Sequence, residues 1–286
     1  MFIEELSEYI DGSYSEFMAY QQIALDMLEE LHAICVQHGI TYYLAYGTLL
    51  GAVRDKCIIP WDYDIDVQIP YREKDKLIQA FKSIDKKYYI NSPEFNEKCR
   101  HYFSRISLKG YNSSALHLDI FYTVGAPQKE LKYRWLFMLI KWVFQARYYK
   151  LVNAKEESMG RRSTLCKLVA FKVLCGLIPL GILNLFYRLL CQACDYEQSE
   201  YFMTADSFGS KRFKKSLVQE RVLQQFGDKR YYIPVGYEEI LRELYGDYTK
   251  YPDIEARCNE FMKSLEKLRY FSRLEENKGS KKKGMG

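Results

Sequence analysis

The chain has 286 residues, of which 48% are hydrophobic and 28% charged, and this composition excludes wholesale disorder. Its length allows one large domain or two small ones, and its formal net charge of +5 is modest. The N-terminal stretch MFIEELSEYI is acidic where a signal peptide is basic, so we expect no secretion and eight reduced cysteines.

The first 125 residues are predicted to form a small α/β unit. Apolar spacing in residues 17–37 predicts an amphipathic helix, which Gly39 closes. The elements expected after it are a strand at 40–46, a turn at Gly47 and Thr48, a short helix at 49–55, a strand at 61–69, a surface helix at 71–87, and strands at 101–108 and 116–124.

After Pro127 the predicted helices are both basic and apolar. Between Lys129 and Arg188, twelve Lys and Arg stand against three Glu, an excess of nine positive charges that indicates an anionic partner. Residues 135–144 and 173–187 are apolar nearly throughout, but neither reaches the roughly 20 residues that span a bilayer. Three alternatives remain for these two stretches: helices packed on the core, a surface that binds a membrane, or a membrane span. Nucleic acid is disfavoured because a phosphate-binding surface needs less aliphatic bulk.

The C-terminal part is predicted to return to soluble helix and loop at 216–268. It includes one helix, YEEILREL, that Gly246 closes. The Lys-, Glu- and Gly-rich end has the composition of a disordered tail. The expected organisation is a catalytic core at 1–126, a basic apolar helical insertion at 127–200, for which a membrane-proximal position is one alternative, a part at 201–270 that completes the same domain, and a disordered tail at 271–286.

The stretch IPWDYDIDVQIP (59–70) carries three aspartates at alternate positions. On a strand, Asp62, Asp64 and Asp66 share one face while the apolar residues between them cover the other. At about 7 Å and an effective dielectric near 20, each pair of carboxylates repels by roughly 2 kcal/mol, which a bound cation would reverse. An EF-hand is rejected because Val67 stands where that loop needs glycine. A solvated strand face remains the alternative to a metal site.

Two further features add to the aspartate strand. Gly47 and Thr48 precede a predicted helix, where Thr48 can cap it and the free amides of 48–50 can hold a phosphate. Asp119 lies among apolar residues in LHLDIF, where it is either salt-bridged or functional because an unpaired buried charge is costly. Two paired carboxylates and a third on another strand form the arrangement that binds Mg²⁺ and organises a nucleotide's phosphates.

These features resemble the nucleotidyltransferase fold superfamily and, more narrowly, the LicD family. The stretches that carry the resemblance are AYGTLLGAVRDKCIIPWDYDIDV (45–67), LDIF (118–121) and IPVGYEEILRELYGDYTKYP (233–252). The resemblance implies an α/β fold, with a nucleotidyltransferase-like mixed sheet, a helical insertion and a helical C-terminal part. It implies metal-dependent transfer of a phosphorylated group, phosphocholine or similar, from a CDP-linked donor to a hydroxyl of a cell-surface glycan or its lipid-linked precursor.

The resemblance also implies roles for particular residues. Asp64, Asp66 and Asp119 would be catalytic and bind Mg²⁺ or Mn²⁺, while Gly47 and Thr48 would hold the donor phosphate. The family usually has an acid where this chain has Tyr63, but that position faces away from the metal, so we expect the site to survive. Further candidates are Arg54, as a phosphate clamp or a helix-dipole partner, His117, as a substrate contact or an interior histidine, and Asp62, beside the metal but not binding it.

The expected partners are the CDP-linked donor, a glycan or lipid-linked glycan acceptor and an anionic membrane surface, with no nucleic acid. The expected location is the cytoplasm, peripheral at the inner face of the membrane. Two alternative functions remain. One is nucleotidyl transfer by attack on the α-phosphate of a nucleoside triphosphate, and the other is a catalytically inactive membrane adaptor.

Overall fold

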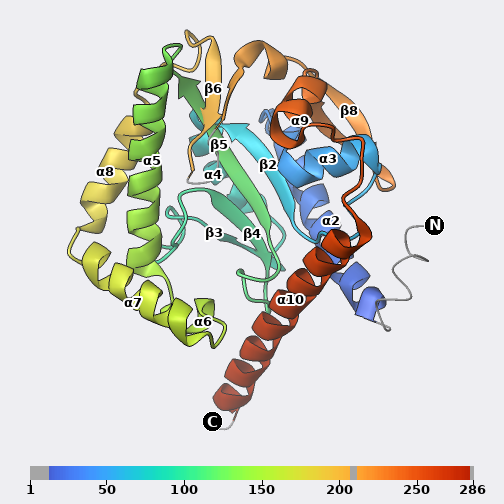
Figure 1. The fold of residues 1–286 in the computed structure, drawn as a ribbon, viewed down its shortest axis with the longest axis vertical. Helices are drawn as coiled ribbons and strands as arrows, with labels where there is room; N and C mark the ends of the chain where they lie inside the picture. Colours follow the sequence, from blue (N-terminus) through green and yellow to red (C-terminus); the bar gives the residue numbers. More distant parts are fainter. Residues whose placement is uncertain (1–12, 207–210, 284–286) are drawn as a thin grey trace.

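A computed structural model describes residues 13–206 and 211–283, and these form a mixed α/β fold, which confirms the predicted fold class (Figure 1). Within them, the central sheet has seven strands: β1 (Tyr43–Leu44), β2 (Ile65–Pro70), β3 (Tyr88–Asn91), β4 (Ser104–Leu108), β5 (Leu118–Ala126), β6 (Tyr201–Thr204) and β7 (Arg212–Lys214). The order is β1-β2-β5-β4-β3, with β6 beside β5 and β7 beside β6. Only the pair β2 and β5 is parallel among these described strands.

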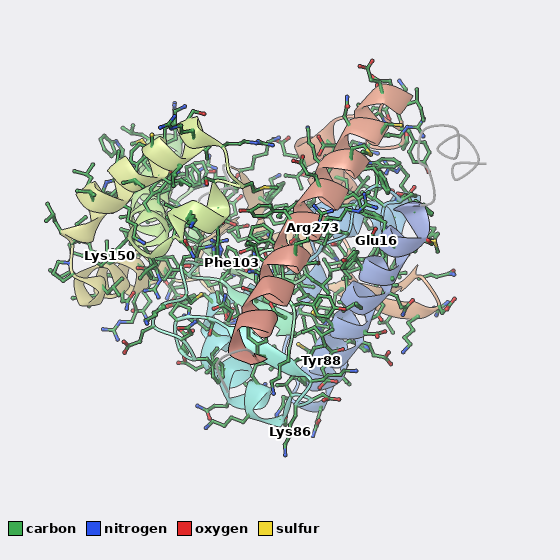
Figure 2. All side chains as sticks on the ribbon, turned by 90° about the horizontal axis from the view of Figure 1, so that it is seen from below. Glu16, Lys86, Tyr88, Phe103, Lys150 and Arg273 are labelled. Atoms are coloured by element: carbon green, nitrogen blue, oxygen red, sulfur yellow. The ribbon has the colours of Figure 1, made fainter. Side chains whose placement is uncertain are left out.

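Two long helices, α2 (Ser13–Gln37) and α10 (Ile254–Lys283), lie side by side on the core (Figures 1 and 2). Their rings meet at Phe17 and Phe261, whose centroids are 4.7 Å apart. The predicted amphipathic helix at 17–37 is confirmed, since one face of it, with Met27, Leu31 and Ile34, is buried in the core that it shares with the sheet. The N-terminal and C-terminal helices are therefore joined into one core with the strands between them.

A second group of elements covers the edge of the sheet at β1. It consists of the short helices α3 (Tyr46–Arg54) and α9 (Tyr237–Tyr245) and a separate hairpin, β8 (Arg221–Phe226) with β9 (Lys229–Pro234). Gly227 has a φ of +64° in the hairpin turn, a conformation that favours glycine. The prediction of helix and loop for this part missed the hairpin, although the two-residue Gly-Asp turn is a recognised signal.

The basic apolar segment forms a helical wall beside the sheet (Figure 1). Its helices are α5 (Glu130–Leu151), α6 (Ala154–Glu157), α7 (Arg162–Gly176) and α8 (Leu180–Cys191). Arg147 of α5 is buried and donates hydrogen bonds to the carbonyls of Cys99 and Glu97 and to Asn184 of α8. No single described helix is long and apolar enough to cross a bilayer, whereas α7 and α8 pass that test together but with an 88° bend between them.

Several predicted boundaries are wrong. The strand at 40–46 shrinks to β1 because α3 already begins at Tyr46. The helix at 71–87 divides into η1 (Tyr71–Glu73), α4 (Lys74–Ala80) and η2 (Phe81–Ser83). It ends early because the Ser83 hydroxyl donates to the carbonyl of Ala80, a side-chain bond that competes with the helical pattern.

The predicted disordered tail also differs from the structure. Helix α10 continues to Lys283, and the remaining residues, 284–286, lie outside the described part of the chain. The Lys- and Glu-rich sequence favours helix once packing of the preceding turns has started one.

Candidate active site

Two acids face each other across the parallel strands at the centre of the sheet. Asp66 of β2 and Asp119 of β5 are register partners, so their side chains leave neighbouring backbones on the same face. Asp64 and Asp62 precede β2, which begins only at Ile65, so they lie in the loop that enters the strand. The predicted alternation is confirmed, because Asp62, Asp64 and Asp66 are half-buried while the apolar residues between them are buried.

The carboxylates strongly disfavour one another's charged forms. Burial raises the pKa of Asp66 well above its ordinary value, and the charges of Asp64, Asp119 and Asp62 raise it further. Burial likewise raises the pKa of Asp62, and the neighbouring Asp64 adds to this through its charge and a hydrogen bond. A cation placed among these groups would replace repulsion with attraction.

Asp119 already has a cationic partner. Arg105 of β4 donates from Nε to Oδ1 at 2.6 Å and from Nη2 to Oδ2 at 2.8 Å, and both side chains are buried. A third bond, from Nη1 to the carbonyl of Ser113, fixes the guanidinium. Burial raises the pKa of Asp119, and the charge of Arg105 opposes that rise. The salt-bridged alternative for Asp119 is thus confirmed, at a position that also faces Asp66.

Gly47 and Thr48 lie inside the first turn of α3 and not in a turn before it. The prediction that Thr48 caps this helix is wrong, since Ala45 holds the cap position without a side-chain bond. The Thr48 hydroxyl instead accepts a hydrogen bond of 2.9 Å from the backbone N–H of Asp66. A Cβ atom on Gly47 would lie 3.1 Å from Oδ2 of Asp62. The positive N-terminal end of α3 is therefore at the carboxylates.

The other two candidate residues, Arg54 and His117, lie in different surroundings. Arg54 lies in the last turn of α3, at the far end from Gly47, and binds Asp55 through Nη2 and Oδ2 at 2.9 Å. His117 is buried with Nε2 only 3.7 Å from Oδ2 of Asp119. Burial lowers the pKa of His117 well below its ordinary value, and the charge of Arg105 adds to this, so the imidazole is neutral at pH 7. His117 therefore lies beside Asp119, whereas Arg54 is paired with Asp55.

Two residues at the site were missed by the sequence analysis. Lys267 of α10 lies close enough that the charges of Asp64 and Asp119 oppose the lowering of its pKa by burial. Burial raises the pKa of Tyr245 of α9, and the charges of Asp66 and its neighbours raise it further. Tyr245 stands in the resembling stretch 233–252, which is a signal for it. Lys267 has no local signal, because its helix is ordinary in composition.

The acids fit a divalent ion by their chemistry and charge. Carboxylate oxygens are the ligands that Mg²⁺ prefers, and Asp62, Asp64 and Asp66 lack a salt bridge to any described residue. Within residues 13–206 and 211–283, however, no group of three His, Cys, Asp or Glu side chains is already arranged to hold a metal. Both oxygens of Asp119 accept hydrogen bonds from Arg105.

Comparisons with known proteins point to one family. A model described as the LicD/FKTN/FKRP nucleotidyltransferase domain matches residues 39–152. Over 82% of its length the chain is 28% identical to the lipopolysaccharide cholinephosphotransferase LicD of Haemophilus influenzae, of which 92% is covered. It is 58% identical to human ribitol 5-phosphate transferase FKRP over 31 residues, which are 11% of this chain and 6% of that protein. The matched domain contains the acids described above.

Proposed function

Residues 39–152 form a LicD-family nucleotidyltransferase domain, and from that premise we propose that the protein transfers phosphocholine or a similar phosphorylated group. The donor is CDP-linked, and the acceptor is a hydroxyl of a cell-surface glycan or of its lipid-linked precursor. The observation that carries this proposal is the juxtaposition of Asp66 and Asp119 at the N-terminal end of α3, inside the matched domain.

We propose that Asp64, Asp66 and Asp119 hold Mg²⁺ or Mn²⁺, which would neutralise charge on the donor phosphates. The chain's own groups supply the positioning. Arg105 orients Asp119 and opposes the rise in its pKa that burial causes. The first-turn amides of α3 at Gly47 and Thr48 are placed to receive a phosphate. His117, a neutral imidazole beside Asp119, is placed to contact the substrate.

A screen by thermal unfolding tests the donor class. In the presence of Mg²⁺, a CDP-linked compound such as CDP-choline, CDP-glycerol or CDP-ribitol is expected to raise Tm by about 5 °C or more at 100 times its Kd. ATP and CTP at equal concentration should raise Tm by less. In Asp66→Asn, the part of the shift that depends on Mg²⁺ should disappear. Stabilisation by triphosphates alone would favour the nucleotidyl-transfer alternative.

We further propose that the helical wall binds the inner face of an anionic membrane. Large apolar side chains are exposed along it, and Leu177 between α7 and α8 is 84% exposed. Such a cluster, mixed with lysines and arginines, is typical of an interfacial surface. Its most exposed apolar members are Leu131, Trp135, Trp142, Val173, Leu174, Leu177, Phe186 and Leu189.

Vesicle sedimentation tests this surface. The protein is expected to pellet with phosphatidylglycerol vesicles and to be released by salt, because screening shortens electrostatic attraction to about 8 Å at physiological ionic strength. Arg161→Glu with Arg162→Glu, both on exposed residues, should remove the binding, whereas the matched control Lys82→Glu with Lys86→Glu should not. Arg147 is buried and unsuitable for this test. Equal loss of vesicle binding in both double variants would contradict the assignment of the helical wall as the membrane-binding surface.

A further inference from the structure

A second feature beside the carboxylates is a cavity of about 380 Å³. Three parts of the chain enclose it: the strands and loops of the core, helices α5 and α6, and helix α10. Arg105 and His117, which contact Asp119, form its inner side. Its lining also includes Arg100, Glu157 and Lys267, and the rings of Phe144, Tyr148 and Tyr149.

The charges that line this cavity are unbalanced. Arg100, Arg105 and Lys267 face it, while Glu157 is the one acid in its lining. Burial lowers the pKa of His101 well below its ordinary value, and the charge of Arg105 lowers it further, so this imidazole adds no charge. A partly enclosed cavity with net positive lining favours an anion.

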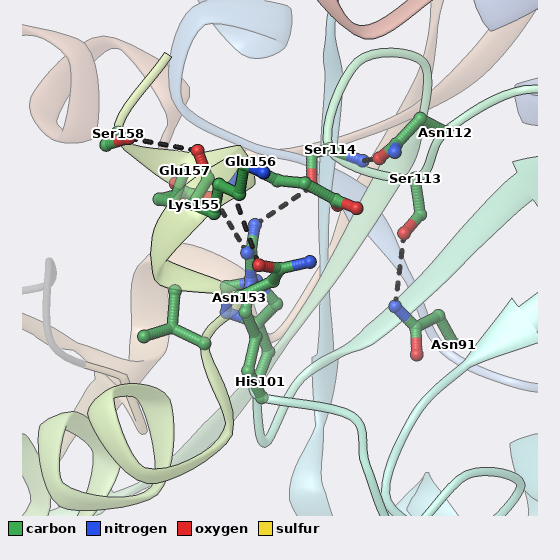
Figure 3. A network of polar contacts seen from close by, with 12 residues as sticks. Asn91, His101, Asn112, Ser113, Ser114, Asn153, Lys155, Glu156, Glu157 and Ser158 are labelled. Carbon is green, nitrogen blue, oxygen red and sulfur yellow. Dashed lines mark hydrogen bonds and ion pairs between the residues drawn. The ribbon is translucent and has the colours of Figure 1, made fainter. Parts of the chain in front are cut away.

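The guanidinium of Arg100 is held in place by its neighbours. Arg100 donates from Nη1 to Glu157 at 2.7 Å, from Nη2 to Ser114 Oγ at 3.1 Å, and from Nε to His101 Nε2 at 3.1 Å. Figure 3 shows these three partners converging from α6, from the loop before β5 and from the segment before β4. A guanidinium has five N–H donors, so three such bonds fix its plane and leave others to meet a ligand.

Lys267 has a different environment. Among the residues that the structure describes, its ammonium group has no hydrogen-bond or salt-bridge partner, and Nζ lies over the ring of Tyr63, 5.5 Å from the centroid. The side chain is half-buried and lies between the carboxylates and the cavity. Acids lie near this amine, but none of the described ones forms an ion pair with it, so it is available to an anionic ligand.

The opposite side of the cavity is aromatic. Phe144, Tyr148 and Tyr149 line it, and Tyr149 is supported by stacking on Phe171 at a centroid distance of 4.7 Å. These rings can contact an organic group attached to the anion.

We propose that this cavity binds a phosphorylated substrate, with its phosphate at Lys267, Arg100 and Arg105 and its organic part against Tyr148 and Tyr149. The inference deepens the proposed function and rests on it for the substrate class. The phosphate could belong to the nucleotide of the donor or to a phosphorylated acceptor, and both share this chemistry. Lys267 is then a substrate-binding residue contributed by the C-terminal helix.

Calorimetric titration in buffer with EDTA tests the proposal without metal and without turnover. The ligands are orthophosphate, CMP and N-acetylglucosamine 1-phosphate. The wild-type chain is expected to bind at least one of them. Lys267→Met should weaken that binding by about tenfold or more, because a charge-assisted bond is lost, and Lys267→Arg should largely keep it. The matched control Lys263→Met, one turn away on the same helix and exposed, should bind as the wild type does.

The ligand that binds more tightly identifies the source of the phosphate. Preference for CMP assigns the cavity to the donor, and preference for the sugar phosphate assigns it to the acceptor. Unchanged affinity in Lys267→Met, or no binding of any of the three by the wild type at millimolar concentration, would overturn the proposal. If the wild type binds one of these ligands through Lys267 but transfers no phosphorylated group, the proposed function is refuted and the cavity proposal stands. Thermal unfolding of each variant without ligand shows whether a loss of binding reflects a loss of fold.

Discussion

Replacing Asp66 by asparagine is expected to reduce phosphoryl transfer by at least about a thousandfold, since a bound metal contributes several kcal/mol and each 1.4 kcal/mol is worth tenfold in rate. Asp64→Asn should have a similar effect. The fold should survive in Asp66→Asn, because burial and the charges of Asp64, Asp119 and Asp62 disfavour a charged side chain at this position, and the amide is neutral. The free energy of unfolding in metal-free buffer should therefore stay the same or rise.

Initial rates and urea denaturation of the same preparations measure both effects. Asp228→Asn, at an exposed acid in the hairpin turn, is the control and should alter neither. Full activity in either Asp64→Asn or Asp66→Asn would remove the assigned site. An inactive variant that is also unfolded would leave the role of the acid to be tested by Asp→Glu replacement, which keeps the charge and moves it.

Asp119→Asn should behave differently from Asp66→Asn. It leaves the buried Arg105 without its carboxylate, and breaking a buried ion pair typically lowers the free energy of unfolding by about 3–5 kcal/mol. Arg105→Met combined with Asp119→Leu should recover much of this loss, since neither charge is left unpaired. Urea denaturation of Arg105→Met, Asp119→Leu and the double variant completes a double-mutant cycle, which isolates the coupling energy between the two side chains. Additive effects of the two single replacements would show that the ion pair contributes little.

The parts of the fold that the sequence predicts are those with strong local periodicity. The helix at 17–37 and the alternation around Asp64 and Asp66 follow from the spacing of apolar residues, and both are confirmed. The strand that carries Asp119 was predicted as 116–124 and lies at Leu118–Ala126, which keeps the acid within it. Local pattern was sufficient for the helix because one face of it is buried, and for β5 because all nine of its residues are buried and its sequence is nearly continuously apolar.

The remaining parts depend on contacts between distant segments. The pairing of Arg105 with Asp119 follows from the register of β4 on β5, which no single strand specifies. Lys267 reaches the site only because α10 packs on α2 and the sheet. Arg147 was counted among the charges of a basic surface, yet it is buried because two backbone carbonyls and Asn184 replace water around it. Sequence pattern gives the charge of such a residue but not its partners.

The second large effect concerns the reaction itself. The same acids can direct a hydroxyl at the α-phosphate of a nucleoside triphosphate, with release of pyrophosphate, or at the β-phosphate of a CDP-linked donor, with release of CMP. Catalysis in either case comes mainly from positioning and charge neutralisation, so the outcome depends on which phosphorus lies in line with the acceptor. We expect the second outcome, because the similarity to the cholinephosphotransferase LicD extends over 82% of the chain. Removal of the divalent ion with EDTA should abolish the release of CMP.

Product analysis with CDP-choline and a glycan acceptor tests the central claim most directly. CMP is expected to appear in a one-to-one ratio with modified glycan, only with Mg²⁺ or Mn²⁺ present, and to be lost in Asp66→Asn. No pyrophosphate should form from CTP or ATP. Pyrophosphate release, with the nucleoside monophosphate attached to the acceptor, would contradict the proposed reaction, and CMP formation that persists in EDTA would contradict the metal site.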